Sequence, residues 1–312
     1  MHKLLGLALT IMLLTASSAT AEQLSLLTGT QHGVYHTFGS VIAQVITNQS
    51  DGKLTITPQI SEASEENIRV LSTNDADLAI IQSDVAHHAY HGTGIFKERY
   101  PHLRAIARLY HEYLHVCASK KSNVQTIIDF KGKKVSVGNK GSGIELNCRQ
   151  IFHIFGIDYS KLKPRFLTLH ETTEQFINNQ LDCFIMTIGI PNKVMQDITN
   201  KKDVHFISLE GPGVATLIKK FPYLLHESIP ANTYKGQDNP IPTLATEAIL
   251  VASDKMSDDV AYKLTKVLFE NLPAIKKLTP VATTISLKHA KDGITIPFHP
   301  GALKYLDKKG RK

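Results

Sequence analysis

Two hydrophobic periods alternate along this chain of 312 residues. Short apolar runs are separated by longer segments in which apolar side chains recur every three or four residues. The first such unit is a run at 24–27, followed by a segment with Val34, Phe38 and Ile42 in helical spacing. Strands that alternate with helices are typical of parallel sheets, so the pattern predicts an α/β fold.

The same alternation continues through the chain. DLAIIQ at 77–82 and LDCFIMTI at 181–188 are predicted to be buried strands because they are apolar almost throughout. We expect the helix after Ser257 to be the longest, a loop at 230–242, and a basic amphipathic helix at the end of the chain. The pattern also predicts strands at 54–60, 165–169 and 204–209, helices over 172–179 and 212–220, and helix caps at Ser64, Ser83 and Ser257.

Two β-rich runs lie far apart in the sequence. Residues 103–118 form the first, which a polar stretch at 110–113 is predicted to break, and residues 246–252 form the second. We interpret them as two passages of the chain between two lobes, because the length suits two lobes of ordinary size. The predicted lobes are residues 22–115 together with 246–312, and residues 116–245.

The first 21 residues have the pattern of a secretory signal peptide. Lys3 provides the positive charge, residues 4–14 form the apolar core, and Ala19-Thr20-Ala21 fits an A-x-A cleavage site. We therefore expect cleavage before Glu22 and a periplasmic mature protein. No later apolar run is long enough to span a membrane.

The stretch DFKGKKVSVGNKGSGIELNC at 129–148 predicts a strand, a glycine-rich turn and a helix. Ser142 is expected to cap the helix, with Glu145 completing a capping box, and Gly156 is expected to end it. Unpaired N–H groups and a positive dipole end make such a helix start a site for a carboxylate or phosphate. A strand–helix turn without a ligand is the alternative interpretation.

Glycine or capping residues occupy four loops at the predicted C-terminal ends of strands. Ligands bind at these ends in open α/β sheets. Two of the loops come from each predicted lobe, so we expect them to face one cleft between lobes joined by a hinge. The loops are residues 28–35, 82–84, 138–143 and 189–192.

Composition and charge exclude some partners. The chain is 42% hydrophobic, which is ordinary for a globular protein. Its net charge of +7 comes from scattered lysines, without a basic stripe interleaved with aromatic residues, so nucleic acid is not an expected partner. Cys117, Cys148 and Cys183 lie in apolar patterns and are expected to be buried thiols rather than a disulfide or a nucleophile.

Histidines at helical spacing suggest a possible metal site. His87 and His91 are four residues apart, as are His32 and His36, but no Cys or carboxylate completes either pair. We therefore interpret them as surface or core-edge residues, and we expect neither a metal nor a cofactor.

Several motifs, in their order and spacing, resemble the TAXI-type solute-binding proteins of TRAP transporters. This resemblance covers nearly the whole mature chain and implies the type II periplasmic-binding fold, with two lobes, a hinge and a ligand cleft. It also implies a small carboxylate ligand, an amino acid or a dicarboxylate, which is delivered to an ion-coupled TRAP permease in the membrane. The motifs are GTQHGVYHTFG, EASEEN, DLAIIQSDVAHHAYHGTG, DFKGKKVSVGNKGSGIE, LDCFIMTIGIPN and ITIPFHPGALKYL.

The resemblance further implies which residues contact the ligand. Lys140 and Gly141 join this set because they belong to the helix start that ends in Ser142 and Gly143. We expect Tyr35, from the opposite lobe, to cover the ligand. The residues implied by the resemblance are Thr30, Gly33, Tyr35, Asn67, Gln82, Ser83, Asp84, Ser142, Gly143, Pro191 and Asn192.

The sequence departs from the family's pattern beside the cleft. His32 replaces a small residue, His36 an aromatic residue, and Ile144 a threonine. Lys140 adds a positive charge at a turn position that usually holds Gly or Pro. The identity of the ligand therefore does not follow from the resemblance.

A secreted enzyme is the alternative function, because dehydratases occur on a similar two-lobed fold. Asp84, Glu145 and His32 could supply acid–base groups in the cleft. Since a helix cap explains Glu145 and a helix start explains Asp84, no residue is left that demands catalysis. We therefore expect a receptor, with no catalytic residue.

Overall fold

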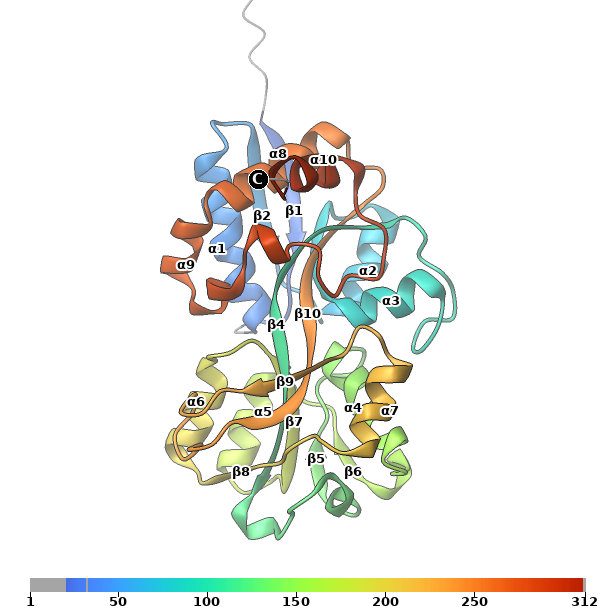
Figure 1. Ribbon diagram of the computed structural model, residues 1–312, viewed down its shortest axis with the longest axis vertical. Coiled ribbons are helices and arrows are strands. Elements are labelled where there is room, and N and C mark those ends of the chain that lie inside the picture. The colour runs from blue at the N-terminus through green and yellow to red at the C-terminus, as the bar shows by residue number, and fades with distance from the viewer. Residues whose placement is uncertain (1–20, 32, 311–312) are drawn as a thin grey trace, which may run out of the picture.

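The computed structural model describes residues 21–31 and 33–310. Figure 1 shows an upper and a lower lobe, with the long strands β4 and β10 running through both. Residues 1–20 of the signal peptide predicted for residues 1–21, and His32, lie outside the described residues. No helix of the described part is both long enough and apolar enough to cross a membrane.

The upper lobe begins with strands and helices in alternation. β1 pairs in parallel with both β2 and β3, as the sequence predicts, and all five residues of β3 are buried. The elements are β1 (Glu22–Leu27), α1 (Val34–Gln49), β2 (Leu54–Gln59), α2 (Ser64–Thr73), β3 (Leu78–Gln82) and α3 (Ser83–His91).

The lower lobe repeats this alternation. β5 pairs in parallel with β6 and with β7, while β8 and β9 are antiparallel to the long strands β4 and β10. The elements are β5 (Lys134–Ser136), α4 (Gly143–Ile154), β6 (Lys163–Arg165), α5 (Leu169–Ile177), β7 (Cys183–Ile188), α6 (Lys193–Lys201), β8 (Val204–Phe206), α7 (Pro212–Lys220) and β9 (Leu225–Ile229).

Two long antiparallel strands, β4 (Leu103–Ser119) and β10 (Ile241–Ser253), join the lobes. They make the sheet mixed, in the order β2-β1-β3-β10-β4-β7-β5-β6. The prediction that the first run breaks near 110–113 is wrong: β4 is continuous, with a shift in register beside Leu109. Its polar residues are accommodated in the interior, where Arg108 Nε donates to Glu247 Oε2 at 2.7 Å.

The C-terminal helices return to the upper lobe (Figure 1). There α8 packs against α1 and α10 packs against α8. The remaining elements are α8 (Asp258–Glu270), α9 (Leu272–Leu278), α10 (Pro300–Gly310) and five short 3-10 helices, Lys120–Ser122, Ile127–Phe130, Tyr159–Lys161, Pro280–Thr284 and Leu287–His289.

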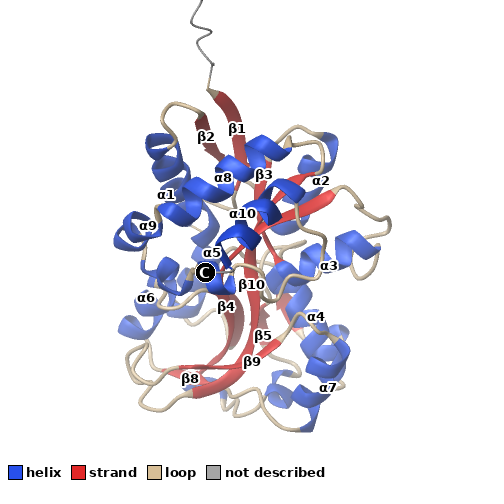
Figure 2. Cartoon of the chain, turned by 45° about the horizontal axis from the view of Figure 1, so that its top comes forward, coloured by secondary structure: helices blue, strands red, loops and turns tan. Residues whose placement is uncertain are grey.

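Helices flank the strands on both sides (Figure 2). Apolar side chains fill the space between them. Phe38, Ile42 and Leu264 belong to a buried cluster of the upper lobe, and Val135 and Phe152 to one of the lower lobe. Each fully buried side chain of this kind stabilises the fold by about 1.5–3 kcal/mol. The three cysteines are buried and unpaired, as predicted.

The predicted bounds of α7 and the predicted cap of α8 are confirmed. Helix α7 has the predicted bounds and carries a proline in its first turn. Ser257 caps α8 by accepting the N–H of Val260, but α8 has 13 residues and α1 has 16, so the helix after Ser257 is not the longest.

Other local predictions are wrong. The strand predicted at 165–169 lies earlier, as β6 (Lys163–Arg165), because Thr168 and Glu171 form a capping box that starts α5 at Leu169. The loop predicted at 230–242 ends early, since Ile241 already pairs with Ile229 of the unpredicted strand β9.

Two predicted serine caps serve other elements instead. Ser64 Oγ accepts the N–H of Gln82 at 3.1 Å rather than capping α2. Ser83 Oγ accepts the N–H of Glu247 at 3.2 Å rather than capping α3. Both serines therefore tie together strands and helices of the upper lobe.

Candidate functional site

The N-terminus of α4 leaves two backbone donors unpaired. Ser142 Oγ accepts the N–H of Glu145 at 3.2 Å, which confirms the predicted cap, whereas the Glu145 carboxylate accepts the N–H of Gly141 at 2.8 Å instead of that of Ser142. The N–H groups of Gly143 and Ile144 have no hydrogen-bond partner among the described residues. This helix start therefore offers free donors at the positive end of the dipole.

The N-terminus of α1 has the same property. The N–H of Gly33 donates to the carbonyl of Thr30 at 2.8 Å, while those of Val34 and Tyr35 find no partner in the described chain. A Cβ at position 33 would lie 2.9 Å from that carbonyl, so only glycine fits this turn without a shift.

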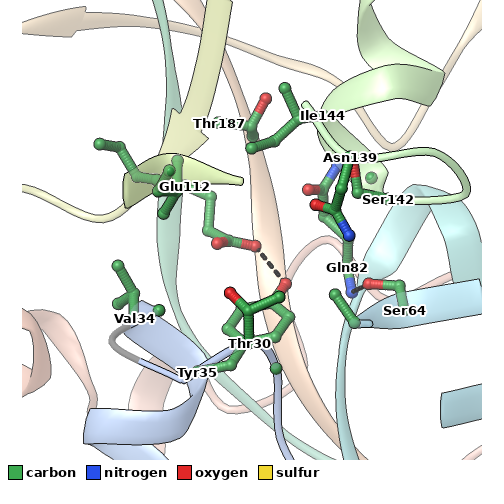
Figure 3. Close-up of a pocket in the computed structure, with 16 residues that line it drawn as sticks. Thr30, Val34, Tyr35, Ser64, Gln82, Glu112, Asn139, Ser142, Ile144 and Thr187 are labelled. Carbon is green, nitrogen blue, oxygen red and sulfur yellow. Dashed lines mark hydrogen bonds between the residues drawn. The ribbon is translucent and has the colours of Figure 1, made fainter. Parts of the chain in front are cut away.

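Both helix starts line one cavity of about 60 Å³ between the lobes (Figure 3). That volume holds a few water molecules. The lining residues come from both lobes: Gly29, Thr30, Gly33, Val34, Tyr35, Ala63, Ser64, Gln82, Glu112, Asn139, Ser142, Gly143, Ile144, Leu169, Thr187 and Ile188.

A buried carboxyl group forms part of the cavity wall. The Tyr35 hydroxyl donates to Glu112 Oε2 at 2.6 Å, the bond drawn in Figure 3, and Glu112 is 2% exposed. Burial raises the pKa of Glu112 to about 8, and the charges of Asp84 and Glu247 act in the same direction, while the bond from Tyr35 lowers it. Burial and, after it, the charge of the neighbouring Glu112 also raise the pKa of Tyr35.

A polar network behind the cavity joins the two lobes. Gln82 Nε2 donates to Asp84 Oδ1 at 2.9 Å and to Asn147 Oδ1 at 2.8 Å. Asn147 Nδ2 in turn donates to Asp84 Oδ2 at 2.6 Å, and the Thr187 hydroxyl donates to Asn147 Oδ1 at 2.9 Å. Burial raises the pKa of Asp84 to about 6, although these hydrogen bonds oppose the shift.

Two glycines allow the lobes to approach this closely. A Cβ at Gly143 would lie 2.3 Å from Gln82 Oε1, and one at Gly141 would lie 2.4 Å from Glu65 Oε2. Gly141 also has a φ of +78°, a conformation that favours glycine. The glycine-rich turn is thus needed for contact between the lobes as well as for the shape of the loop.

The structure brings only part of the predicted site together. Among the other predicted residues, Lys140 is exposed, and the N–H of Gly141 is used by Glu145. Pro191 and Asn192 line a separate hollow of about 480 Å³ that shares Val34 with the cavity. The predicted residues that line the cavity are Thr30, Gly33, Tyr35, Gln82, Ser142 and Gly143.

The remaining predicted residues lie behind the wall. Asn67 is fully buried, and its Nδ2 donates to the carbonyls of Thr28 and Ile80 at 2.8 Å. Ser83 bonds to the backbone of β10, and Asp84 lies behind Gln82. These three side chains brace the residues that face the cavity.

The cavity-lining residues Glu112 and Thr187 are absent from the predicted site, and Asn139 is included only through the predicted loop 138–143. The signal for Glu112 was present, since a carboxylate inside a long apolar strand needs a reason to be there. The polar stretch predicts a break in the strand, whereas in the structure it marks the point where β4 passes the cavity.

The described members of the histidine pairs, His36, His87 and His91, have no set of metal ligands around them. The rings of His87 and His91 lie 4.3 Å apart, and His36 Nδ1 lies 3.1 Å from the Thr28 hydroxyl. Within residues 21–31 and 33–310, no three side chains of His, Cys, Asp or Glu are placed to hold a metal ion.

Most of the chain is similar in fold to solved two-lobed binding proteins. MatC from Rhodopseudomonas palustris with bound malate is 10% identical, with a TM-score of 0.57, and the match covers 93% of this chain and 96% of that one. The periplasmic aliphatic sulphonate binding protein SsuA from Escherichia coli is 13% identical, with a TM-score of 0.50 and coverage of 92% and 84%.

A third similar structure is the binding protein component of an ABC phosphonate transporter from Pseudomonas aeruginosa. It is 12% identical, with a TM-score of 0.53, and the match covers 84% of this chain and 79% of that one. At these identities the likeness establishes the fold, which is the two-lobed α/β architecture of periplasmic binding proteins. The sequence model of the NMT1-like family matches residues 26–310, and this chain therefore belongs to the NMT1-like family.

Proposed function

We propose that this protein is an extracytoplasmic solute receptor that binds a small carboxylate between its lobes and delivers it to an ion-coupled TRAP permease. The observation that carries this proposal is the cavity where the starts of α1 and α4 meet. Two helix starts direct free N–H groups and two positive dipole ends toward one small space. A carboxylate is well suited to such donors, because charge-assisted hydrogen bonds are about twice as strong as neutral ones.

The proposed ligand contacts are the cavity-lining side chains and the backbone of the α4 start. Ser142 and Gly143 would hold the carboxylate from the lower lobe, and Tyr35 would cover it from the upper lobe. Asn67, Ser83 and Asp84 would act indirectly, by fixing the residues in front of them. Lys140 would contribute through its charge near the mouth of the cleft.

Closure of the lobes around the ligand is the proposed working step. It is supported by hydrogen bonds that cross between the lobes, such as Gln82 to Asn147 at 2.8 Å and His88 Nε2 to the Tyr223 hydroxyl at 2.7 Å. Because β4 and β10 are the long strands that run through both lobes, bending of these strands would provide the hinge.

We propose the same lobe boundaries as the sequence suggests, residues 22–115 with 246–312, and residues 116–245. The buried clusters support this division, because their buried members come from one proposed lobe each, except for Leu114 and Leu146. Leu114 lies next to the proposed boundary. Leu146 lies on α4 and packs against the upper lobe, which is a further contact of the closed arrangement.

Similar structures support a receptor role and an acidic ligand. MatC holds malate, and the other two are described as binding proteins for sulphonates and phosphonates. All of these compounds carry anionic oxygens. Together with the signal-peptide pattern, this supports a periplasmic receptor that is loaded with a small anion.

Mass spectrometry of small molecules retained through gentle purification tests the proposal. We expect a small carboxylate to be released in near-stoichiometric amount and to rebind in calorimetry. The same ligand should be recovered unchanged after prolonged incubation, whereas chemical conversion of it would favour a secreted enzyme. Failure of every released or added carboxylate to bind would contradict the proposed function.

A further inference from the structure

The cavity that holds the proposed anion site also contains an acceptor that the protein does not use. One oxygen of Glu112, Oε2, accepts the Tyr35 hydroxyl at 2.6 Å, but Oε1 has no hydrogen-bond partner among the described residues. Glu112 is only 2% exposed, and it forms part of the cavity wall. Figure 3 shows the carboxyl group directed into the space between the lobes.

The described lining of the cavity offers this carboxyl group no positively charged partner. Among the described residues that line the cavity there is no Lys, Arg or His. Two other buried acids nearby already have partners: Asp84 accepts from Gln82 and Asn147, and Glu247 accepts from Arg108. Glu112 is therefore the one acidic side chain on the described wall, opposite the free N–H groups of α4.

We propose that Glu112 determines the specificity of this receptor by accepting the protonated amine of the ligand, so that the receptor takes α-amino acids with an uncharged side chain rather than dicarboxylates. This inference rests on the proposed function and narrows it. The α4 start would hold the carboxylate, and Glu112 would hold the ammonium group of the same small molecule. A zwitterion supplies both charges within a few bonds, which suits a cavity of about 60 Å³.

Electrostatics favours an ammonium group of the ligand beside Glu112 over a second carboxylate of the ligand in that place. Burial raises the pKa of Glu112 to about 8 because a carboxylate there is removed from water, and the charges of Asp84 and Glu247 add to the shift. An ammonium group at Oε1 would provide the missing charge and would stabilise the carboxylate form. A dicarboxylate would instead have to bind beside a carboxyl group that stays protonated.

The rest of the wall argues against a charged ligand side chain. Val34, Ile144, Leu169 and Ile188 supply apolar surface, and the other side chains are neutral. A second carboxylate, as in aspartate, would find no cation to pair with it on the described wall. Small aliphatic amino acids therefore fit the lining best.

Calorimetry at pH 7 with matched pairs of compounds tests the inference. Each pair differs only by the amine: L-alanine and propionate, L-valine and 3-methylbutanoate, L-aspartate and succinate. We expect alanine or valine to bind at least about tenfold more tightly than its deaminated partner, and more tightly than aspartate or succinate. In Glu112→Gln this preference should fall to less than about threefold, since an amide oxygen still accepts a hydrogen bond but carries no charge.

The matched control is Glu210→Gln, which removes the same charge from an exposed position outside the cavity and should leave all affinities unchanged. Equal or tighter binding by a deaminated member in the unmutated protein overturns the inference and leaves the proposed function standing. An amine preference that survives in Glu112→Gln overturns the role of this residue. If neither member of any pair binds, both the inference and the proposed carboxylate-receptor function fail.

Discussion

Ser142 contributes both to the fold, as a helix cap, and to the proposed ligand site. Its hydroxyl accepts the N–H of Glu145 at 3.2 Å, and the residue also lines the cavity. Its effects on stability and on binding can be separated, because a carboxylate side chain is as good a helix cap as a hydroxyl but repels an anion.

Substitution of Ser142 should therefore give two distinct results. Ser142→Ala should cost about 0.5–2 kcal/mol of stability as a lost cap. Ser142→Asp should retain the cap but lower the affinity for a carboxylate ligand at least tenfold, or about 1.4 kcal/mol. Urea unfolding and calorimetry measure the two effects. Near-normal affinity in Ser142→Asp would mean that the anion binds elsewhere.

Glu112 should make the stability of the protein depend on pH. Its folded pKa of about 8 lies above the value of about 4.3 expected for an unfolded chain, so its stabilising contribution is lost as the pH rises toward 8. The buried acid Asp84, with a pKa of about 6, acts in the same direction at lower pH. His88 and His115, each with a pKa lowered to about 4 mainly by burial, act oppositely, but only below about pH 6.5.

The window from pH 6.5 to 8 thus isolates Glu112 among these groups. We expect the free energy of unfolding of the ligand-free protein to fall across this window, by at most about 1.4 kcal/mol per pH unit. Urea unfolding of Glu112→Gln should show a flatter profile. Identical slopes in the two proteins would show that Glu112 does not carry a raised pKa.

At the scale of the element, α4 is the helix that meets the opposite lobe. Gly143 lies against Gln82, and Asn147, one turn further, exchanges hydrogen bonds with Gln82 and Asp84. Gln150, on the same helix, donates to the Tyr223 hydroxyl at 3.0 Å, and that hydroxyl also contacts His88. The helix proposed to hold the ligand's carboxylate is therefore also a helix that bonds to the opposite lobe.

Gly143→Ala tests this double role. The added Cβ would lie 2.3 Å from Gln82 Oε1, so the lobes could not close to their present distance. We expect ligand affinity to fall at least tenfold. Alanine is a better helix former than glycine by about 1 kcal/mol, so the ligand-free protein should be as stable as before or more so. Unchanged affinity by calorimetry would show that close contact between Gln82 and residue 143 is not required.

Some elements could be predicted because interactions within one helical turn decide where they begin. Pro212 and Ser257 start their helices as expected, because a missing N–H and a capping hydroxyl act within one turn. The cavity could be anticipated at Tyr35, Gln82 and Ser142, which follow strands or start helices.

Other features depend on contacts far away in the sequence. β9 is a strand only because Leu225–Ile229 lies beside β10, and Ser64 bonds to Gln82 instead of capping its helix. Glu112 appeared to interrupt a strand because its partner, Tyr35, is 77 residues away. No local period in the sequence encodes such pairings.

For the whole molecule, the account requires an equilibrium between an open and a closed form. The described arrangement is closed, with α4 bonded across the cleft and a cavity of only about 60 Å³. A ligand of more than a few atoms needs more room than this, so we expect the lobes to separate when it enters. Binding should therefore shift the population from open to closed by the ligand's preference for the closed form.

Small-angle X-ray scattering with and without a saturating ligand tests this claim most directly. We predict that the ligand-free protein has a larger radius of gyration, and that the saturated protein gives the scattering curve expected from the closed structure described here. Gly143→Ala should remain expanded at the same ligand concentration. A radius of gyration that does not change at saturation in the unmutated protein would contradict closure around the ligand.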